Sequence, residues 1–327
     1  MMKVFVTAEM PEEVLALIRQ EHQVESYAAD PPIDRQTLLK SVADKAGLLC
    51  TITDRIDTEL LACAKALKVI ANFGVGFEHI DLAAATQRGI PVTNTPGVLT
   101  DTTADLAFAL ILATARRVVE GDRRVREGKF QYWAPLLFLG QEVSGKTLGI
   151  IGMGRIGQAV ARRAAGFSMK IIYHNRTRLA PAEEQSLQAS AVEFSTLLRA
   201  ADFVSLHVPL TPQTRHLIGP QELALMKPSA HLINTARGPV VDETALVTAL
   251  SQWQIRGAGL DVYENEPELT PGLADLENVV LLPHVGSATV ETRTRMAMMA
   301  AENLLTALRG DPPPNCLNWT DLQRQKW

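Results

Sequence analysis

The sequence predicts an α/β protein with two domains, each built on a parallel sheet, and three observations carry this prediction. Short apolar runs alternate with helix-like segments through the first hundred residues. A second series of strand-like runs starts at a glycine-rich turn around residues 152–157. The length of 327 residues suits one large domain or two. A βαβα rhythm of this kind is typical of parallel sheets with helices on both faces.

The first series ends before the glycine-rich turn begins, which indicates a separate domain. Pro11 stands near the start of a helix-like segment, where its missing N–H group costs nothing. Asp57 is a plausible N-cap. The expected strands are residues 4–7, 24–27, 47–52, 69–72 and 91–94. The expected helices are residues 11–21, 35–43, 57–64 and 82–87.

The glycine-rich turn has the spacing G-x-G-x-x-G at Gly152, Gly154 and Gly157. An apolar run precedes it, and residues 158–167 follow with apolar side chains at helical spacing. The first glycine allows a tight turn, the second lets backbone approach a pyrophosphate, and the third lets helix and strand pack closely. The helix N-terminus offers free N–H groups to the anion. We therefore expect dinucleotide binding, and the alternative is a glycine-rich turn of some other α/β protein.

The second series of strands ends repeatedly in polar residues, where ligands bind in open parallel sheets. The expected strands are residues 170–173, 203–207, 232–234, 257–261 and 279–282, and the expected helices are 195–200, 243–251 and 296–308. Because the second sheet is complete before the last helix, that helix should return to the first domain. The sequence thus predicts a substrate domain of residues 1–99 plus 287–327 and a dinucleotide-binding domain of residues 100–286.

Composition excludes several classes of function. Apolar residues make up 46% and charged residues 21%, and the net charge of −4 leaves no basic footprint for nucleic acid. The three cysteines, Cys50, Cys63 and Cys316, show neither metal-ligand spacing nor a disulfide framework, so no metal is expected. The longest apolar stretch, residues 106–115, is too short to span a membrane. Without a signal peptide at the start, we expect a cytoplasmic protein.

Residues 100–117 link the two series and are apolar nearly all round, which is typical of a helix buried on more than one face. Our interpretation is a helix that joins the domains and packs against a second subunit. The alternative is the central core helix of a monomer. Residues 132–138 add Trp133 and further large apolar side chains in an irregular segment. A homodimer is therefore expected.

The choice of dinucleotide depends on the residues after the strand at 170–173. NAD-selective sites place a carboxylate about 20 residues after the first glycine, to hold the ribose hydroxyls. No carboxylate occurs between residues 170 and 182, where Asn175, Arg176, Thr177 and Arg178 stand instead. Guanidinium groups bind a 2′-phosphate that a carboxylate would repel. NADP is therefore expected over NAD, with NAD possible, and the alternative is an exposed turn that happens to be basic.

Three side chains of complementary chemistry stand at strand ends: Arg237, Glu266 and His284. Histidine is the usual proton donor to a carbonyl oxygen near neutral pH, and a neighbouring carboxylate keeps it charged. Arginine can clamp a substrate carboxylate with two hydrogen bonds. Each has an ordinary alternative, namely a structural histidine, a loop charge and a turn cap. Their shared placement at strand ends favours a catalytic site.

Seven segments, spread along almost the whole chain, resemble the D-isomer-specific 2-hydroxyacid dehydrogenase family. They are residues 72–81 (NFGVGFEHID), 94–98 (NTPGV), 149–157 (GIIGMGRIG), 207–211 (HVPLT), 234–238 (NTARG), 261–267 (DVYENEP) and 283–289 (PHVGSAT). Within the family, the chain is most similar to the glyoxylate/hydroxypyruvate reductase branch. The resemblance implies a flavodoxin-like substrate domain and a Rossmann doubly wound dinucleotide-binding domain.

The resemblance also implies roles for individual residues. Arg237 would bind the substrate carboxylate, His284 would give the proton, and Glu266 would hold His284 protonated. The implied cofactor-binding residues are Thr103, Gly152, Gly154, Arg155, Ile156, Gly157, Asn175, Arg176, Thr177, Val208, Pro209, Thr214, Thr235, Ala236, Arg237, Asp261, His284 and Gly286. The implied substrate-binding residues are Thr51, Val75, Gly76, Arg237, His284 and, from the neighbouring subunit, Trp133.

The implied activity is NADPH-dependent reduction of glyoxylate or hydroxypyruvate to the D-2-hydroxyacid. Two alternatives remain open at this point. The same chemistry could act on a larger 2-oxoacid such as 2-ketogluconate. The chain could also be a nucleotide-sensing scaffold, because transcriptional co-repressors share this fold and the same three side chains.

Overall fold

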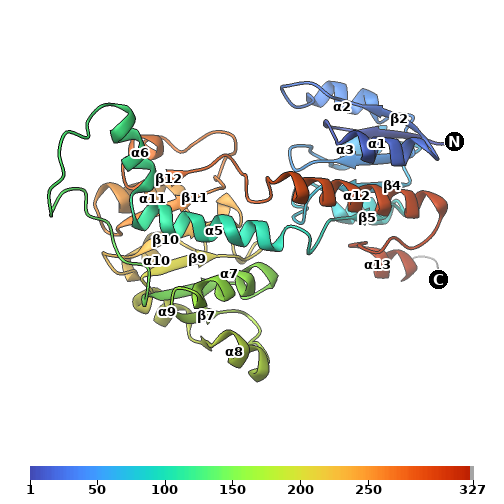
Figure 1. Cartoon of the computed structure of the whole chain (residues 1–327). Coiled ribbons are helices and arrows are strands. Elements are labelled where there is room, and N and C mark those ends of the chain that lie inside the picture. Colours follow the sequence, from blue (N-terminus) through green and yellow to red (C-terminus); the bar gives the residue numbers. More distant parts are fainter. Residues whose placement is uncertain (325–327) are drawn as a thin grey trace. The chain divides into compact units, whose positions relative to one another are not determined.

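The computed structural model describes residues 1–324 and divides into two compact units (Figure 1). The first unit comprises Met1–Leu99 together with the chain from Ala288 onward. The second unit comprises Thr100–Ser287. Ser287, which the sequence analysis placed with the first domain, thus lies in the second unit.

The first unit contains a five-stranded parallel sheet in the order β2-β1-β3-β4-β5. This is the flavodoxin-like order. The strands are β1 Lys3–Val6, β2 Gln23–Ser26, β3 Gly47–Cys50, β4 Val69–Asn72 and β5 Val92–Thr93. The helices of this unit are α1 Glu12–Arg19, α2 Arg35–Ser41, α3 Thr58–Cys63, α4 Leu82–Gln87, α12 Val290–Arg309 and α13 Trp319–Arg324.

Apolar side chains cover both faces of this sheet. On one face, α1 and α12 pack their buried residues against Val4, Val6 and Leu49. On the other face, α2, α3 and α4 pack against Phe5 and Leu48. The alternation of these strand residues between the two clusters follows the period-2 geometry of a strand. The long helix α12 therefore lies on the sheet of the first unit, where its position after the completed second sheet predicts it.

The second unit contains a seven-stranded parallel sheet in the order β12-β11-β10-β9-β6-β7-β8. Counted from β6, its first six strands have the Rossmann order 3-2-1-4-5-6. The strands are β6 Thr147–Ile151, β7 Lys170–His174, β8 Ala189–Ala191, β9 Phe203–Leu206, β10 His231–Asn234, β11 Gly257–Leu260 and β12 Val279–Leu281. The strand order reverses between β6 and β9, which is where such sheets bind ligands.

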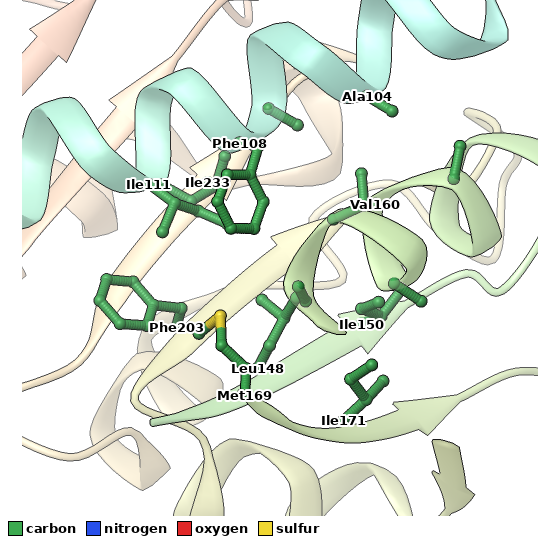
Figure 2. Packing of buried hydrophobic residues seen from close by; sticks show 14 of the residues in the cluster. Ala104, Phe108, Ile111, Leu148, Ile150, Val160, Met169, Ile171, Phe203 and Ile233 are labelled. Atoms are coloured by element: carbon green, nitrogen blue, oxygen red, sulfur yellow. The ribbon is translucent and has the colours of Figure 1, made fainter. Parts of the chain in front are cut away.

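Helices flank both faces of this second sheet. They are α5 Thr100–Ala115, α6 Val118–Arg126, α7 Arg155–Ala165, α8 Pro181–Leu187, α9 Phe194–Ala200, α10 Pro220–Leu225 and α11 Glu243–Ser251, with 3-10 turns η1 Gly238–Val240 and η2 Leu273–Asp275. Figure 2 shows α5 and α7 over β6, with Phe108, Ile111 and Val160 above Leu148 and Ile150. The opposite face is covered by α9, α10 and α11.

The apolar segment after residue 99 forms α5, which belongs to the core of its own unit. Ala104, Phe108 and Ile111 are buried there. Leu106 and Leu112 are only partly buried, and Ala109 is exposed. One side of α5 is thus part of the hydrophobic core of the second unit. The other side carries apolar residues that are partly buried or exposed, namely Leu106, Ala109 and Leu112.

Candidate functional site

The glycine-rich turn lies between the end of β6 and the start of α7, as its spacing predicts. Gly152 has a φ of +95°, and a Cβ there would lie 2.7 Å from the His207 carbonyl oxygen. A Cβ on Gly157 would lie 2.3 Å from the Gly152 carbonyl oxygen, so helix and strand meet at van der Waals contact. A Cβ on Gly154 would meet nothing within 4 Å. The open side of the turn at Gly154 is therefore accessible to a ligand.

Several features of this turn fit a nicotinamide dinucleotide. The N–H groups of Arg155 and Ile156 lie in the first turn of α7, at the end of a helix that binds anions. The buried hydroxyl of Thr235, beyond the end of β10, has no hydrogen-bond partner among residues 1–324. A buried hydroxyl without a partner is costly, so a polar ligand group at this position would stabilise it. The residues present therefore fit a dinucleotide.

The segment after β7 carries the basic residues that the sequence analysis singled out. Arg176 is exposed, and the Asn175 amide donates to the Thr177 carbonyl at 2.7 Å. Arg178 instead makes two 2.8 Å hydrogen bonds to the Glu184 carboxylate on α8. The hydrogen bond from Arg178, with a second from Tyr173, lowers the pKa of Glu184 to about 2. Of the two arginines, Arg178 is therefore already paired.

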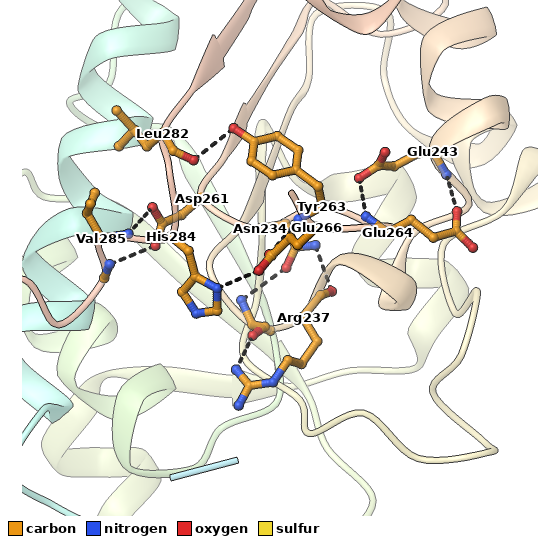
Figure 3. A network of polar contacts seen from close by, with 12 residues as sticks. Asn234, Arg237, Glu243, Asp261, Tyr263, Glu264, Glu266, Leu282, His284 and Val285 are labelled. Atoms are coloured by element: carbon orange, nitrogen blue, oxygen red, sulfur yellow. Dashed lines mark hydrogen bonds and ion pairs between the residues drawn. The ribbon is translucent and has the colours of Figure 1, made fainter. Parts of the chain in front are cut away.

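His284 and Glu266 form a hydrogen-bonded pair at the carboxyl edge of the second sheet (Figure 3). The distance from His284 Nδ1 to Glu266 Oε2 is 2.8 Å, and the Tyr263 N–H donates to Glu266 Oε1 at 2.9 Å. Burial of Glu266 opposes its ionisation, but the hydrogen bond and charge of His284 outweigh burial and lower the pKa of Glu266. Glu266 is thus a carboxylate at neutral pH.

His284 has a φ of +55°, an unusual backbone conformation for a residue with a side chain. Asp261, which follows β11, holds the turn after His284. Its carboxylate accepts hydrogen bonds from the N–H groups of Val285 and Gly286, both at 2.7 Å. Burial raises the pKa of Asp261, which is only 1% exposed. Strained residues cluster at functional sites, where the surrounding contacts over-determine them.

Arg237 follows β10 and lies close enough to Glu266 for its charge to help lower the Glu266 pKa. Its carbonyl accepts from the Asn234 amide at 3.0 Å, and its Nη1 donates to the Ala236 carbonyl at 2.7 Å. Figure 3 shows Arg237, Glu266 and His284 within one polar network. The structure thus brings the three residues together within the second unit.

Other residues of the second unit that the sequence predicts to bind the cofactor lie around the same carboxyl ends of the strands. A Cβ on Gly286 would lie 3.1 Å from Asp261 and 3.5 Å from Thr103 on α5. Val208 and Pro209 follow β9, and the Thr214 hydroxyl donates to the Pro209 carbonyl at 2.6 Å. Trp133 lies in the irregular segment after α6, where its side chain is 78% exposed.

The residues of the first unit that the sequence predicts to bind substrate lie beyond the carboxyl ends of the strands of its own sheet. The Thr51 N–H donates to the buried carboxylate of Asp54 at 2.7 Å. Val75 and Gly76 belong to the turn after β4, and Val75 is 37% exposed. Sequence reasoning did not single out Asn72 and Asn94, whose side-chain amides hold this turn. The available signals were an asparagine at the end of each strand, β4 and β5, and the family-like segments 72–81 and 94–98 that begin at these two residues.

Neither a metal cluster nor a membrane-spanning helix occurs among residues 1–324. No group of three or more His, Cys, Asp or Glu residues in this range is arranged to hold a metal ion. No helix in the same range is long and apolar enough to cross a membrane.

The chain is similar to known proteins over 97% of its length. Residues 108–286 match the family described as D-isomer specific 2-hydroxyacid dehydrogenase, NAD binding domain. A glyoxylate reductase of Thermococcus litoralis is 53% identical over 320 residues, which cover 97% of this chain and 96% of that protein. The TT0316 protein of Thermus thermophilus is 49% identical, with a TM-score of 0.91 and coverage of 97% of this chain and 100% of that one.

A second solved structure has a ligand-bound site. The NADPH-dependent glyoxylate/hydroxypyruvate reductase of Sinorhizobium meliloti, in complex with NADP and malonate, is 33% identical to this chain. Its TM-score is 0.84, and the match covers 96% of each chain.

Proposed function

The chain belongs to the D-isomer specific 2-hydroxyacid dehydrogenase family and is an NAD(P)-dependent oxidoreductase that reduces a 2-oxoacid to the 2-hydroxyacid. On this premise we propose that it reduces glyoxylate and hydroxypyruvate to the D-2-hydroxyacid, with NADPH as the preferred cofactor. The observation that carries the proposal is the hydrogen-bonded pair of His284 and Glu266 beside Arg237. His284 supplies a proton donor, and Glu266 supplies a carboxylate that stabilises the positive charge of that donor. Arg237 supplies a cation for an acidic substrate.

When bound, the nicotinamide dinucleotide would supply the hydride that reduces the carbonyl carbon of the 2-oxoacid. In our proposal, His284 gives a proton from Nε2 to the carbonyl oxygen, which becomes the hydroxyl of the product. Its Nδ1 faces Glu266, so the other ring nitrogen is directed away from the carboxylate. Arg237 binds the substrate carboxylate and polarises the neighbouring carbonyl. The N–H groups of Val75 and Gly76 add further donors to the carboxylate.

Turnover tests this function directly. Loss of NADPH absorbance should be rapid with glyoxylate and hydroxypyruvate and slower with pyruvate and 2-ketogluconate. Faster reduction of 2-ketogluconate would favour an enzyme for a larger 2-oxoacid. Absence of turnover with all four acids, despite NADPH binding, would favour a nucleotide-sensing scaffold and refute the proposal.

The preference for NADPH rests on Arg176. It is exposed beyond the carboxyl end of β7, and no carboxylate stands between residues 170 and 182. Arg178 is paired with Glu184, so its charge is already balanced. We therefore infer that Arg176 binds the 2′-phosphate, together with the neighbouring Asn175 and Thr177.

The two arginines form a matched pair for testing this preference. Arg176→Met should lower the ratio of kcat/KM for NADPH to that for NADH by about 10-fold or more, because a charge-assisted phosphate contact is lost. Arg178→Met removes the same charge two residues away and should change the ratio much less. A ratio unchanged in Arg176→Met, or equal losses in both variants, would contradict the assignment.

We also propose a homodimer. Large apolar side chains are exposed together in the segment after α6, where Tyr132 is 64%, Trp133 78% and Leu136 84% exposed. Contiguous exposed apolar side chains mark interaction surfaces. Sedimentation should give twice the 35.7 kDa of one chain, and Leu136→Asp should shift it toward the monomer. If Trp133 borders the partner's substrate site, Trp133→Ala should raise KM for the 2-oxoacid more than KM for NADPH.

A further inference from the structure

The turn that follows β4 has three consecutive backbone carbonyls that accept hydrogen bonds from side-chain amides. Asn72 Nδ2 donates to the Gly74 carbonyl at 3.2 Å and to the Gly76 carbonyl at 2.8 Å. Asn94 Nδ2, beyond the end of β5, donates to the Val75 carbonyl at 2.9 Å. Three consecutive carbonyl groups of one short turn are thereby fixed.

Fixing these carbonyls also fixes the N–H groups of the turn. In a planar trans peptide the N–H points opposite to the C=O of the same unit. The N–H groups of Val75, Gly76 and Phe77 are therefore each directed away from the fixed carbonyl of the same peptide unit, which is that of Gly74, Val75 and Gly76 in turn. Among residues 1–324, the structure records no backbone or side-chain acceptor for these three N–H groups. The turn thus presents three consecutive donors.

The two asparagines are themselves firmly placed. Asn72 is fully buried at the end of β4, and its Oδ1 lies 3.1 Å from His79 Nε2. Both amide hydrogens of Asn72 are used by the turn, because Nδ2 has two donors and serves two carbonyls. Asn94 is 8% exposed. Side chains placed in this way restrain the turn in advance of ligand binding.

We propose that Asn72 and Asn94 are positioning residues that preset a carboxylate-binding cradle made of the N–H groups of Val75, Gly76 and Phe77. This inference rests on the proposed function and deepens it, because it assigns the selectivity for acids over neutral aldehydes to two side chains that never touch the substrate. Consecutive backbone N–H groups form anion-binding concavities. Donors fixed in advance need no reorganisation when the ligand binds.

Glyoxylate and glycolaldehyde distinguish this role from a merely structural one, because both carry an aldehyde and only glyoxylate has a carboxylate. Asn72→Ala and Asn94→Ala should lower the ratio of kcat/KM for glyoxylate to that for glycolaldehyde, roughly 10- to 100-fold for Asn72. Asn72→Asp keeps the size but has no N–H donor, and should behave as Asn72→Ala does. Oxalate, a carboxylate inhibitor, should bind more weakly to all three variants, with NADPH affinity changed much less.

Asn318→Ala is the matched control. Asn318 is 1% exposed in the same unit and makes hydrogen bonds to Val92 and Ile90, away from the turn. It should lower Tm and leave the substrate ratio unchanged. The proposal is overturned if kcat/KM falls by the same factor for glyoxylate and for glycolaldehyde in the Asn72 variants. It is also overturned if Asn318→Ala changes the ratio of these two values as much as the Asn72 variants do. A wild-type protein that binds oxalate through this turn but reduces no 2-oxoacid would refute the proposed function and leave the cradle standing.

Discussion

A single methyl group at Gly238 should disrupt the catalytic geometry, because the chain passes too close to the loop that carries Glu266. A Cβ at this position would lie 1.8 Å from the Tyr263 carbonyl oxygen and 2.5 Å from the Glu264 nitrogen. Real Cβ atoms essentially never approach closer than 3.0 Å, so the two segments must separate by at least about 1.2 Å. Tyr263 positions Glu266 through its N–H, and Glu266 positions His284.

The Gly238→Ala variant is therefore expected to lose about 10²-fold in kcat, which is the effect of a displacement near 1 Å. The free energy of unfolding should fall by about 1–3 kcal/mol, as for other overpacked sites. Stopped-flow NADPH oxidation gives kcat, and urea titration gives stability. Gly166→Ala, whose Cβ would lie 3.4 Å from its nearest neighbour, is the control and should keep kcat. A Gly238→Ala enzyme within about threefold of the wild-type kcat would refute the reasoning.

Three further changes have defined outcomes. His284→Ala should lower kcat by about 10²- to 10⁴-fold and weaken NADPH binding far less, and a near-normal kcat would remove His284 as the acid. Glu266→Gln removes a charge 2.8 Å from His284 Nδ1, so kcat should fall while NADPH affinity changes much less; an unchanged kcat would contradict a role for the pairing. Burial, with the nearby charge of Arg256, lowers the pKa of His231 from 6.5 to about 4. The neutral, buried His231 therefore makes the free energy of unfolding depend on pH. Its contribution of about 3 kcal/mol is complete above pH 6.5 and is lost as the pH falls to 4. Urea titrations should therefore show a flatter pH dependence for His231→Gln, and equal slopes would exclude this cause.

Much of the architecture could be predicted because strong local patterns coincide with global topology. The apolar run before Gly152 forms β6, and Asp57 caps α3 through the Leu60 N–H, as its position indicates. Helices α6, α8, α10 and α13 and strand β8 were missed. They are short, with three to nine residues, and α8 has one buried residue, Leu187, whereas α6 has none. Their placement depends on packing against neighbouring elements, which local periodicity does not encode.

The candidate site also has some features that the sequence could predict and others that it could not. Arg237, Glu266 and His284 could be singled out because the carboxyl ends of parallel strands share one edge, whatever the details of the loops. The pairing of Arg178 with Glu184 and the amide bonds of Asn72 could not be predicted. Each of these contacts depends on the rotamer of the side chain and on the position of its partner, and sequence spacing determines neither the rotamer nor that position.

Asp261 shows how the site keeps an unfavourable conformation in place. His284 needs a left-handed backbone, which costs of order 1–3 kcal/mol for a residue with a side chain. A buried carboxylate is also unfavourable on its own, and burial accordingly raises the pKa of Asp261. The two 2.7 Å hydrogen bonds to Val285 and Gly286 offset both costs at once. The same bonds thus satisfy the carboxylate and close the turn after His284. The orientation of the proposed proton donor therefore depends on Asp261 as well as on Glu266.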